Sequence, residues 1–131
     1  MSKNGRLNWL KRILAVKVVL TLFGWGLPAL LAPLSFLEFL GVPTPDDPLF
    51  LRLFGAVVTA FGIAYWHAYK DPVRNIAILK AGVLDNGLVT LAIFVFTAFY
   101  DLRSIFILIS GLLTFVFFIS FILLMPRTET A

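Results

Sequence analysis

Four long runs of apolar residues dominate the chain, and short clusters of charged residues or prolines bound each run. A membrane-spanning helix needs about 20 predominantly apolar residues to cross roughly 30 Å of hydrocarbon. Lipid offers no partner to an exposed backbone amide, and the alternating polarity of a barrel strand is missing here, so all four runs are expected to be helical. The pattern predicts spans at 13–32, 49–69, 81–100 and 104–125.

The connections between these runs differ in character. Residues 33–48 begin with an amphipathic stretch and end in a proline-rich segment, which predicts a short interfacial helix followed by a rigid turn. Asp47 followed by Pro48 places an N-cap acceptor before a residue suited to the first helical position, so the second helix should begin there. The Asp-Pro pair at 71–72 repeats this signal before the third helix. Only residues 101–103 separate the last two runs, which predicts a tight antiparallel hairpin.

Composition supports a membrane protein. Hydrophobic residues make up 60% of the 131 residues and charged residues only 14%, whereas an ordinary soluble domain carries about 25% charged residues. The run at 13–32 is also too long for the hydrophobic region of a signal peptide, which has roughly 7 to 15 residues. The expected fold is therefore all-α: one four-transmembrane-helix bundle over residues 1–131.

The basic residues indicate an orientation. Under the positive-inside rule, the side with more Lys and Arg faces the cytoplasm. Eight basic residues fall on one predicted side and two, Arg52 and Arg103, on the other. This predicts cytoplasmic termini in a prokaryotic inner membrane, with Lys70, Arg74 and Lys80 against anionic lipid. The eight residues are Lys3, Arg6, Lys11, Arg12, Lys70, Arg74, Lys80 and Arg127.

Several chemistries find no support in the residues. The chain has no cysteine and one histidine, which leaves no thiolate chemistry and too few ligands for a zinc site or a two-histidine haem site in one chain. No Gly-rich phosphate loop or nucleic-acid module occurs, and the basic residues stand at the ends of apolar runs. We therefore expect no metal, no nucleic acid and no catalytic residue, and the sequence identifies no cofactor.

The stretch from Tyr65 to Asn75 holds the single histidine among aromatic and charged residues. We interpret it as a turn between two helices in the cytoplasmic headgroup layer. Tyr65, Trp66 and Tyr69 then belong to the aromatic belt at that depth.

A second group of polar residues lies inside the apolar runs. Asp85 and Asn86 interrupt the third run, where a carboxylate costs several kcal/mol unless it is paired, protonated or hydrated. Lys17 lies about one turn inside the first run from the same side. These residues either fix the helix register by an ion pair and hydrogen bonds or form a ligand or proton site. The predicted inner-leaflet cluster comprises Lys17, His67, Asp85 and Asn86, with Thr21 and Thr90 as further members.

Small residues recur along the second helix at spacings that allow close helix packing in lipid, although Ala and Gly are also common in membranes generally. If this stripe is an interface, the second helix is the centre of the bundle and the Phe-rich fourth helix faces lipid. Pro28 should kink the first helix, and Arg52 should reach headgroups or pair with an acidic residue such as Asp101. The stripe comprises Gly55, Ala56, Thr59, Ala60, Gly62 and Ala64.

The segment "RLFGAVVTAFGIAYWHAYKDPVRNIAILKAGVLDNGLVTL" resembles small bacterial membrane proteins of the BphX-like and DoxX-like kind. The shared features are Arg52 and Gly55 at the start of the second helix, the Gly62 region with its aromatics, the "KDPVRN" turn and the "DNG" at 85–87. The resemblance covers the second and third helices. It implies a four-helix inner-membrane bundle, and DoxX-like relatives suggest a respiratory or quinone-linked setting.

Two hypotheses for function follow. In the first, the protein is a non-enzymatic accessory subunit or homo-oligomer that packs through the second or fourth helix. In the second, the polar cluster binds a quinone, a lipid or another small lipophile, in connection with redox or proton chemistry. The expected partners are membrane lipids in both cases, together with a membrane complex or a lipophilic ligand.

Overall fold

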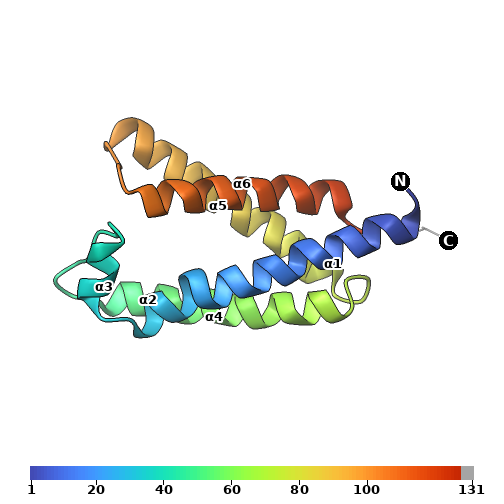
Figure 1. The fold of residues 1–131 in the computed structure, drawn as a ribbon, viewed down its shortest axis with the longest axis horizontal. Helices are drawn as coiled ribbons and strands as arrows, with labels where there is room; N and C mark the ends of the chain where they lie inside the picture. The colour runs from blue at the N-terminus through green and yellow to red at the C-terminus, as the bar shows by residue number, and fades with distance from the viewer. Residues whose placement is uncertain (128–131) are drawn as a thin grey trace.

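The structure is a computed structural model that describes residues 1–127, and every regular element in that range is helical. The helices run in the order shown in Figure 1. They are α1 (Lys3–Val19), the π-helix η1 (Leu20–Gly26), α2 (Leu27–Leu31), α3 (Leu34–Phe39), α4 (Leu49–Lys70), α5 (Ile76–Phe99) and α6 (Ile105–Leu124).

Four of these helical stretches are long and apolar enough to cross a membrane: the continuous segment from Lys3 to Leu31, and α4, α5 and α6. This confirms the all-α class and the four candidate spans. Two boundaries differ from the prediction. The first helix begins ahead of residue 13, since Ser2 caps it by accepting the Gly5 N–H at 3.1 Å. The third begins at Ile76 after a turn over 72–75, in which Asp71 accepts the Arg74 N–H, so Pro72 does not start it.

Pro28 acts on the turn that precedes it. A proline inside a helix lacks an N–H and clashes with the carbonyl four residues earlier. Here η1 immediately precedes that position, and the Leu27 N–H donates to the Leu22 carbonyl, five residues back. The wider π turn carries the chain past Pro28 without ending the helix.

The first helical hairpin joins the α1–α2 segment to α4, and glycines make the contact close. A Cβ on Gly55 would lie 2.6 Å from the carbonyl carbon of Ala29, and one on Gly62 would lie 2.5 Å from the Leu22 side chain. The glycine face of α4 therefore packs against the α1–α2 segment. Gly26 repeats the arrangement from the other side, because its missing Cβ makes room for Thr59.

The alanines of the same stripe point elsewhere. Ala56 and Ala60 are exposed and Ala64 is half-buried, while Gly55 and Gly62 are buried. Residues seven apart share a helix face, whereas Ala56 and Ala60 fall on the opposite side. The expectation that α4 is the centre of the bundle is wrong, because the α1–α2 segment has the largest buried share and lies between α4 and α6. The expectation that the fourth helix faces lipid more than α4 is also wrong, since α6 is the more buried of the two.

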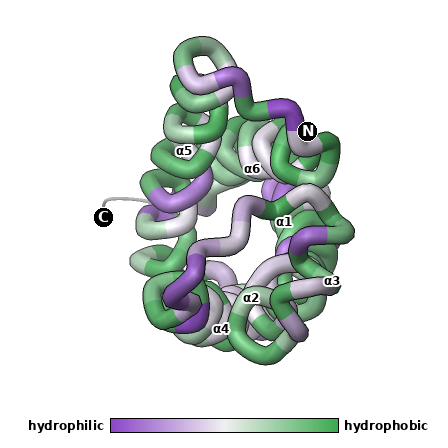
Figure 2. The backbone as a smooth tube through the Cα atoms, turned by 90° about the vertical axis from the view of Figure 1, so that its left-hand side faces the viewer, coloured by the Kyte–Doolittle hydropathy of each residue, from purple (hydrophilic) through white to green (hydrophobic). Residues whose placement is uncertain are grey.

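The second hairpin pairs α5 with α6, as the short connection predicted. Asp101 turns the chain with a positive φ of 53°, a conformation that Asp tolerates better than most residues. Ser104 then caps α6 by accepting the Ile107 N–H. Viewed from the end, hydrophobic residues cover most of the long helices, and the polar stretches are concentrated in connections and helix ends (Figure 2).

Gly55→Ala should lower the free energy of unfolding by about 1 to 3 kcal/mol, the usual cost of overpacking, because the new methyl group meets backbone atoms of Ala29 and Leu30. Gly24→Ala is the matched control, since a Cβ there meets only the Leu20 side chain at 3.8 Å. Thermal unfolding in detergent, followed by circular dichroism, measures both. Equal stability of the two variants would contradict the inward glycine face.

Candidate functional site

Lys17 is the one buried cation among residues 1–127, with only 2% of its surface exposed. It faces inward because Leu10, Leu14 and Lys17 follow one another at the spacing of a single helix face, and all three are buried. Its Nζ donates a hydrogen bond to Oδ1 of Asn86 on α5 at 2.7 Å. A buried ammonium needs such an acceptor, because leaving it unpaired would cost several kcal/mol.

Asn86 is fully buried and uses both ends of its amide. While Oδ1 accepts from Lys17, Nδ2 donates to the Gly82 carbonyl at 2.6 Å and to the Tyr65 hydroxyl oxygen at 3.3 Å. The amide thereby has a partner for its acceptor and for both of its donor hydrogens.

Tyr65 carries the connection onward to Asp85. Its hydroxyl donates to Oδ2 of Asp85 at 3.1 Å. Lys17 and Asp85 form no direct ion pair within the described chain, and two neutral side chains separate the cation from the carboxylate. We call the four residues Lys17, Asn86, Tyr65 and Asp85 the polar relay. Each of the three hydrogen bonds between its members is donated by the residue nearer Lys17 to the residue nearer Asp85.

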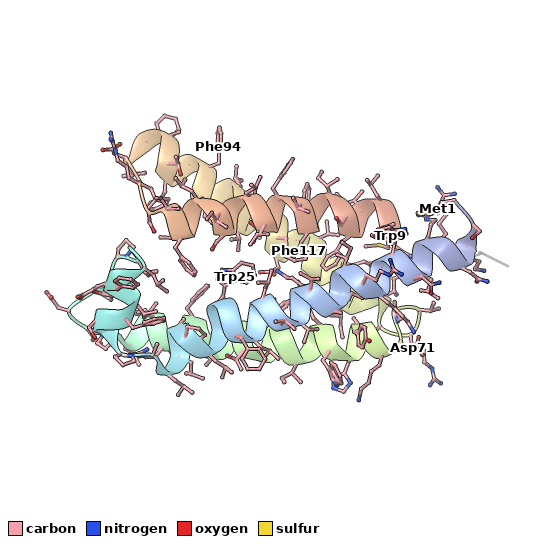
Figure 3. The ribbon with its side chains drawn as sticks, in the orientation of Figure 1. Met1, Trp9, Trp25, Asp71, Phe94 and Phe117 are labelled. Carbon is pink, nitrogen blue, oxygen red and sulfur yellow. The ribbon has the colours of Figure 1, made fainter. Side chains whose placement is uncertain are left out.

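Aromatic rings surround the Lys17 ammonium on its other sides. The ring centroids of Trp25, Tyr65 and Phe117 lie 5.2, 5.3 and 4.8 Å from Nζ. At this range the negative face of a ring attracts a cation, and the attraction is stronger when water is absent. The Trp25 indole also donates to Oγ of Ser110 at 2.8 Å, which ties η1 to α6. Figure 3 shows Trp25 and Phe117 projecting into the space between the α1–α2 segment and α6.

Gly82 makes room for this arrangement. A Cβ at Gly82 would lie 2.8 Å from the Tyr65 hydroxyl oxygen and 3.0 Å from the Phe121 ring. Gly82 leaves room for the Tyr65 side chain, and Asn86 forms a hydrogen bond with it. Because Gly82 and Asn86 are one helical turn apart, they share one face of α5.

The predicted cluster members thus separate into two groups. Lys17, Asp85 and Asn86 come together in the polar relay, whereas His67 is exposed near the end of α4. The backbone carbonyl of His67 accepts hydrogen bonds from the Asp71 N–H and the Asn75 side chain, and these contacts hold the α4–α5 turn.

The remaining polar residues do not join the polar relay. Thr21 is buried, and its hydroxyl has no hydrogen-bond partner among residues 1–127. Thr90 pairs with Thr114 at 2.9 Å. Arg52 donates to the Ala29 carbonyl at 3.0 Å, and Asp101 pairs instead with Arg103, so the expected partnership of Arg52 with an acidic residue is not formed.

Three basic residues predicted to contact lipid, Lys70, Arg74 and Lys80, are exposed. Lys70 lies over the Trp66 ring at 5.1 Å, and Trp66 stacks on Tyr69. Contact with anionic lipid stays a prediction for all three.

Sequence reasoning missed the central position of Tyr65. It was assigned to the aromatic belt, but it is fully buried. One signal was present: Tyr65 follows Gly62 by three residues, which places it near the inward glycine face. The local sequence gives no comparable indication for Trp25, Ser110 and Phe117. Their contacts depend on how α6 packs against η1.

No family model, curated protein or solved structure matches the chain. The resemblance to BphX-like and DoxX-like proteins therefore stays a prediction. Within the described residues, no group of three or more His, Asp or Glu side chains could hold a metal ion.

The polar relay can be tested by a double-mutant cycle. Asn86→Leu should destabilise the protein by about 3 kcal/mol, because it leaves the Lys17 ammonium buried without its acceptor. Lys17→Met removes the charge together with the need for an acceptor, so the double variant should regain at least about half of that loss. Unfolding free energies of the two single variants and the double variant give the coupling. Strictly additive losses would mean that the two side chains do not depend on each other.

Proposed function

We propose that the protein is a non-enzymatic, multi-pass protein of a prokaryotic inner membrane, and that it works as a subunit of an oligomer. Both termini and the α4–α5 connection are cytoplasmic in this proposal. Two observations support the orientation: the eight-to-two distribution of basic residues, and the position of the start of α1, the end of α6 and the α4–α5 connection at one end of the bundle (Figure 1).

The polar relay supports a structural role for the buried polar residues. Lys17, Asn86 and Tyr65 have at most 2% of their surface exposed. These side chains hydrogen-bond one another. The rings of Trp25, Tyr65 and Phe117 surround the Lys17 ammonium. A substrate would have to break these contacts before it could reach the ammonium. The polar relay therefore supports a structural role, in which these residues hold α1, α4 and α5 in register. It gives less support to a catalytic role.

The observation that carries the oligomer proposal is the outward side of α4. Its exposed residues combine small side chains, Ala56 and Ala60, with larger neighbours, Leu53 and Ile63. We call this surface the α4 outer face. Lipid-embedded helices gain packing energy where small residues let two backbones approach. The larger neighbours would fill the spaces over the alanines of a second copy.

A twofold axis along the membrane normal would place two α4 helices side by side and parallel. Each residue near such an axis meets its own counterpart, as at any isologous interface. Ala56 and Ala60 lie one helical turn apart, so both would face the axis. The α4 outer face would thus be self-complementary without any contribution from α5 or α6.

The absence of cysteine from the sequence makes a clean cross-linking test available. Single Ala56→Cys and Ala60→Cys variants should each form a disulfide-linked dimer on mild oxidation in native membranes, because equivalent α4 positions meet at the axis. The dimer fraction is read on a non-reducing gel. Ala92→Cys, on an exposed position of α5, is the matched control and should stay monomeric.

A second pair of variants tests the energy of the same interface. Ala56→Phe combined with Ala60→Phe should convert the dimer to monomer in size-exclusion chromatography with light scattering, because the phenyl groups keep the backbones apart. Ala92→Phe combined with Ala98→Phe changes the same residue types on exposed α5 positions and should leave the dimer intact. A monomeric wild type, or equal cross-linking at Ala60 and Ala92, would refute the oligomer proposal.

One observation favours the second function, a small-lipophile site. Asp85 is only half-buried, and Tyr65 is the one hydrogen-bond donor that reaches it within the described chain. In Figure 1, α5 diverges from α4 with distance from the connection that joins the two helices. A quinol, the reduced form of a quinone, or a lipid with a hydroxyl group could donate to the Asp85 oxygen that Tyr65 leaves available.

Decylubiquinol is a suitable probe for this site, since its hydroxyl groups donate hydrogen bonds. If the lipophile site exists, Asp85→Asn should weaken its binding at least about tenfold, or about 1.4 kcal/mol, while the thermal unfolding temperature stays near that of wild type. Tryptophan fluorescence measures binding, with Thr97→Ala on the outer part of α5 as the control. Unchanged binding combined with a lowered unfolding temperature would assign Asp85 to the structural relay alone.

A further inference from the structure

A cavity of about 460 Å³ lies where α1 begins and α6 ends, away from the polar relay. Lys3, Arg6 and Arg127 contribute to its lining together with the apolar side chains of Leu7, Val73 and Leu124. We propose that this terminal cavity binds the phosphate of an anionic phospholipid from the cytoplasmic leaflet. The inference rests on the proposed membrane topology but not on the proposed oligomer.

Among the described residues that line the terminal cavity, three are basic and none is acidic. Arg6 is held in place, because its Nη2 donates to the Leu123 carbonyl at the end of α6 at 2.7 Å. A guanidinium has five N–H donors in a planar fork, so a group anchored through one nitrogen still presents others to a phosphate.

The apolar part of the lining fits the rest of a phospholipid. Leu7 and Leu124 come from the two helices that form the walls, and Val73 comes from the α4–α5 turn. A free phosphate ion would leave these side chains exposed to water. A phospholipid would cover them with its glycerol and the first methylene groups of its acyl chains, which adds hydrophobic binding energy to the charge interaction.

The length of the first helix places the terminal cavity at headgroup depth. The continuous helical segment from Lys3 to Leu31 has 29 residues, which is roughly 43 Å of helix, against about 30 Å of hydrocarbon. The excess lies at the N-terminal end, where the polar residues of α1 are concentrated. Trp9, exposed and with the Arg12 guanidinium 5.3 Å from its ring, has the amphipathic character of a residue at the membrane interface.

A simpler role for the same cations is to neutralise the negative C-terminal end of α6. That role predicts stabilisation in any lipid. The lipid site predicts stabilisation that depends on an anionic headgroup, and this difference decides between the two roles.

The test compares nanodiscs of phosphatidylcholine with nanodiscs that contain phosphatidylglycerol. Wild type should unfold at a higher temperature with phosphatidylglycerol, and native mass spectrometry from detergent should retain one phosphatidylglycerol per chain. Arg6→Gln combined with Arg127→Gln should weaken retention at least about tenfold and reduce the temperature difference. Lys70→Gln combined with Arg74→Gln removes two exposed charges outside the cavity lining and should preserve the retained lipid, because the predicted contact of these residues with anionic lipid contributes only to the temperature difference.

Three outcomes would overturn the proposal. An equal loss of retained lipid in the control pair would assign the effect to general surface charge. Stabilisation of wild type by inorganic phosphate as large as that by phosphatidylglycerol would exclude a lipid as the specific ligand. The third outcome concerns Glu129, which is outside the described residues: if Glu129→Gln lowers the unfolding temperature in phosphatidylcholine as much as the cavity variant does, the cations serve the chain's own acid. Loss of the α4 cross-link would refute the oligomer and leave this test intact, since lipid retention is measured on each chain.

Discussion

The Lys17 ammonium must find an acceptor in an interior that offers almost only hydrocarbon, and Asn86 is the side chain that reaches it. This requirement fixes the height of α5 relative to α1, because a displacement by one residue would turn the amide to another side of α5. Tyr65 extends the constraint to α4, since its hydroxyl accepts from Asn86 and donates to Asp85. One charged group thus sets the register of three helices.

The two hairpins need such a constraint, because apolar packing alone joins them weakly. Within each hairpin the helices pack along much of their length, whereas fewer residues connect α1 with α6 or α4 with α5. Apolar side chains can slide past one another at little cost, but an ammonium and its acceptor cannot. Replacing a buried charged group by apolar residues is often neutral or stabilising. We therefore regard the polar relay as a determinant of a unique arrangement more than as a source of stability.

The sequence predicted the helices well and the contacts between them only in part. Run length and composition were enough for the four candidate spans and the hairpin at 101–103, because these depend on local residues. The energetic cost of placing polar side chains inside apolar runs correctly identified Lys17, Asp85 and Asn86 as residues that need partners. It could not identify those partners: a tyrosine near a helix end suits the interface as well as the core, and only the approach of α5 to α4 decides the place of Tyr65. Likewise, the sequence placed Gly55 and Ala56 in one stripe of small residues, and only the structure separates the covered glycine from the exposed alanine.

The π-helix η1 has a consequence for how this chain tolerates insertion and deletion. A π turn contains an additional residue relative to an α-helix, so Leu20–Gly26 turns through less rotation per residue than a regular α-helix does. If the same residues formed a regular α-helix, everything beyond them would rotate by about 100° relative to Lys17. The cation would stay with Asn86, while the surface that meets Gly55 would turn away from α4. This short segment therefore sets the phase between two interfaces of one helix: deleting one of its residues would let a regular α-helix form with that phase kept, whereas inserting a further residue would disturb it.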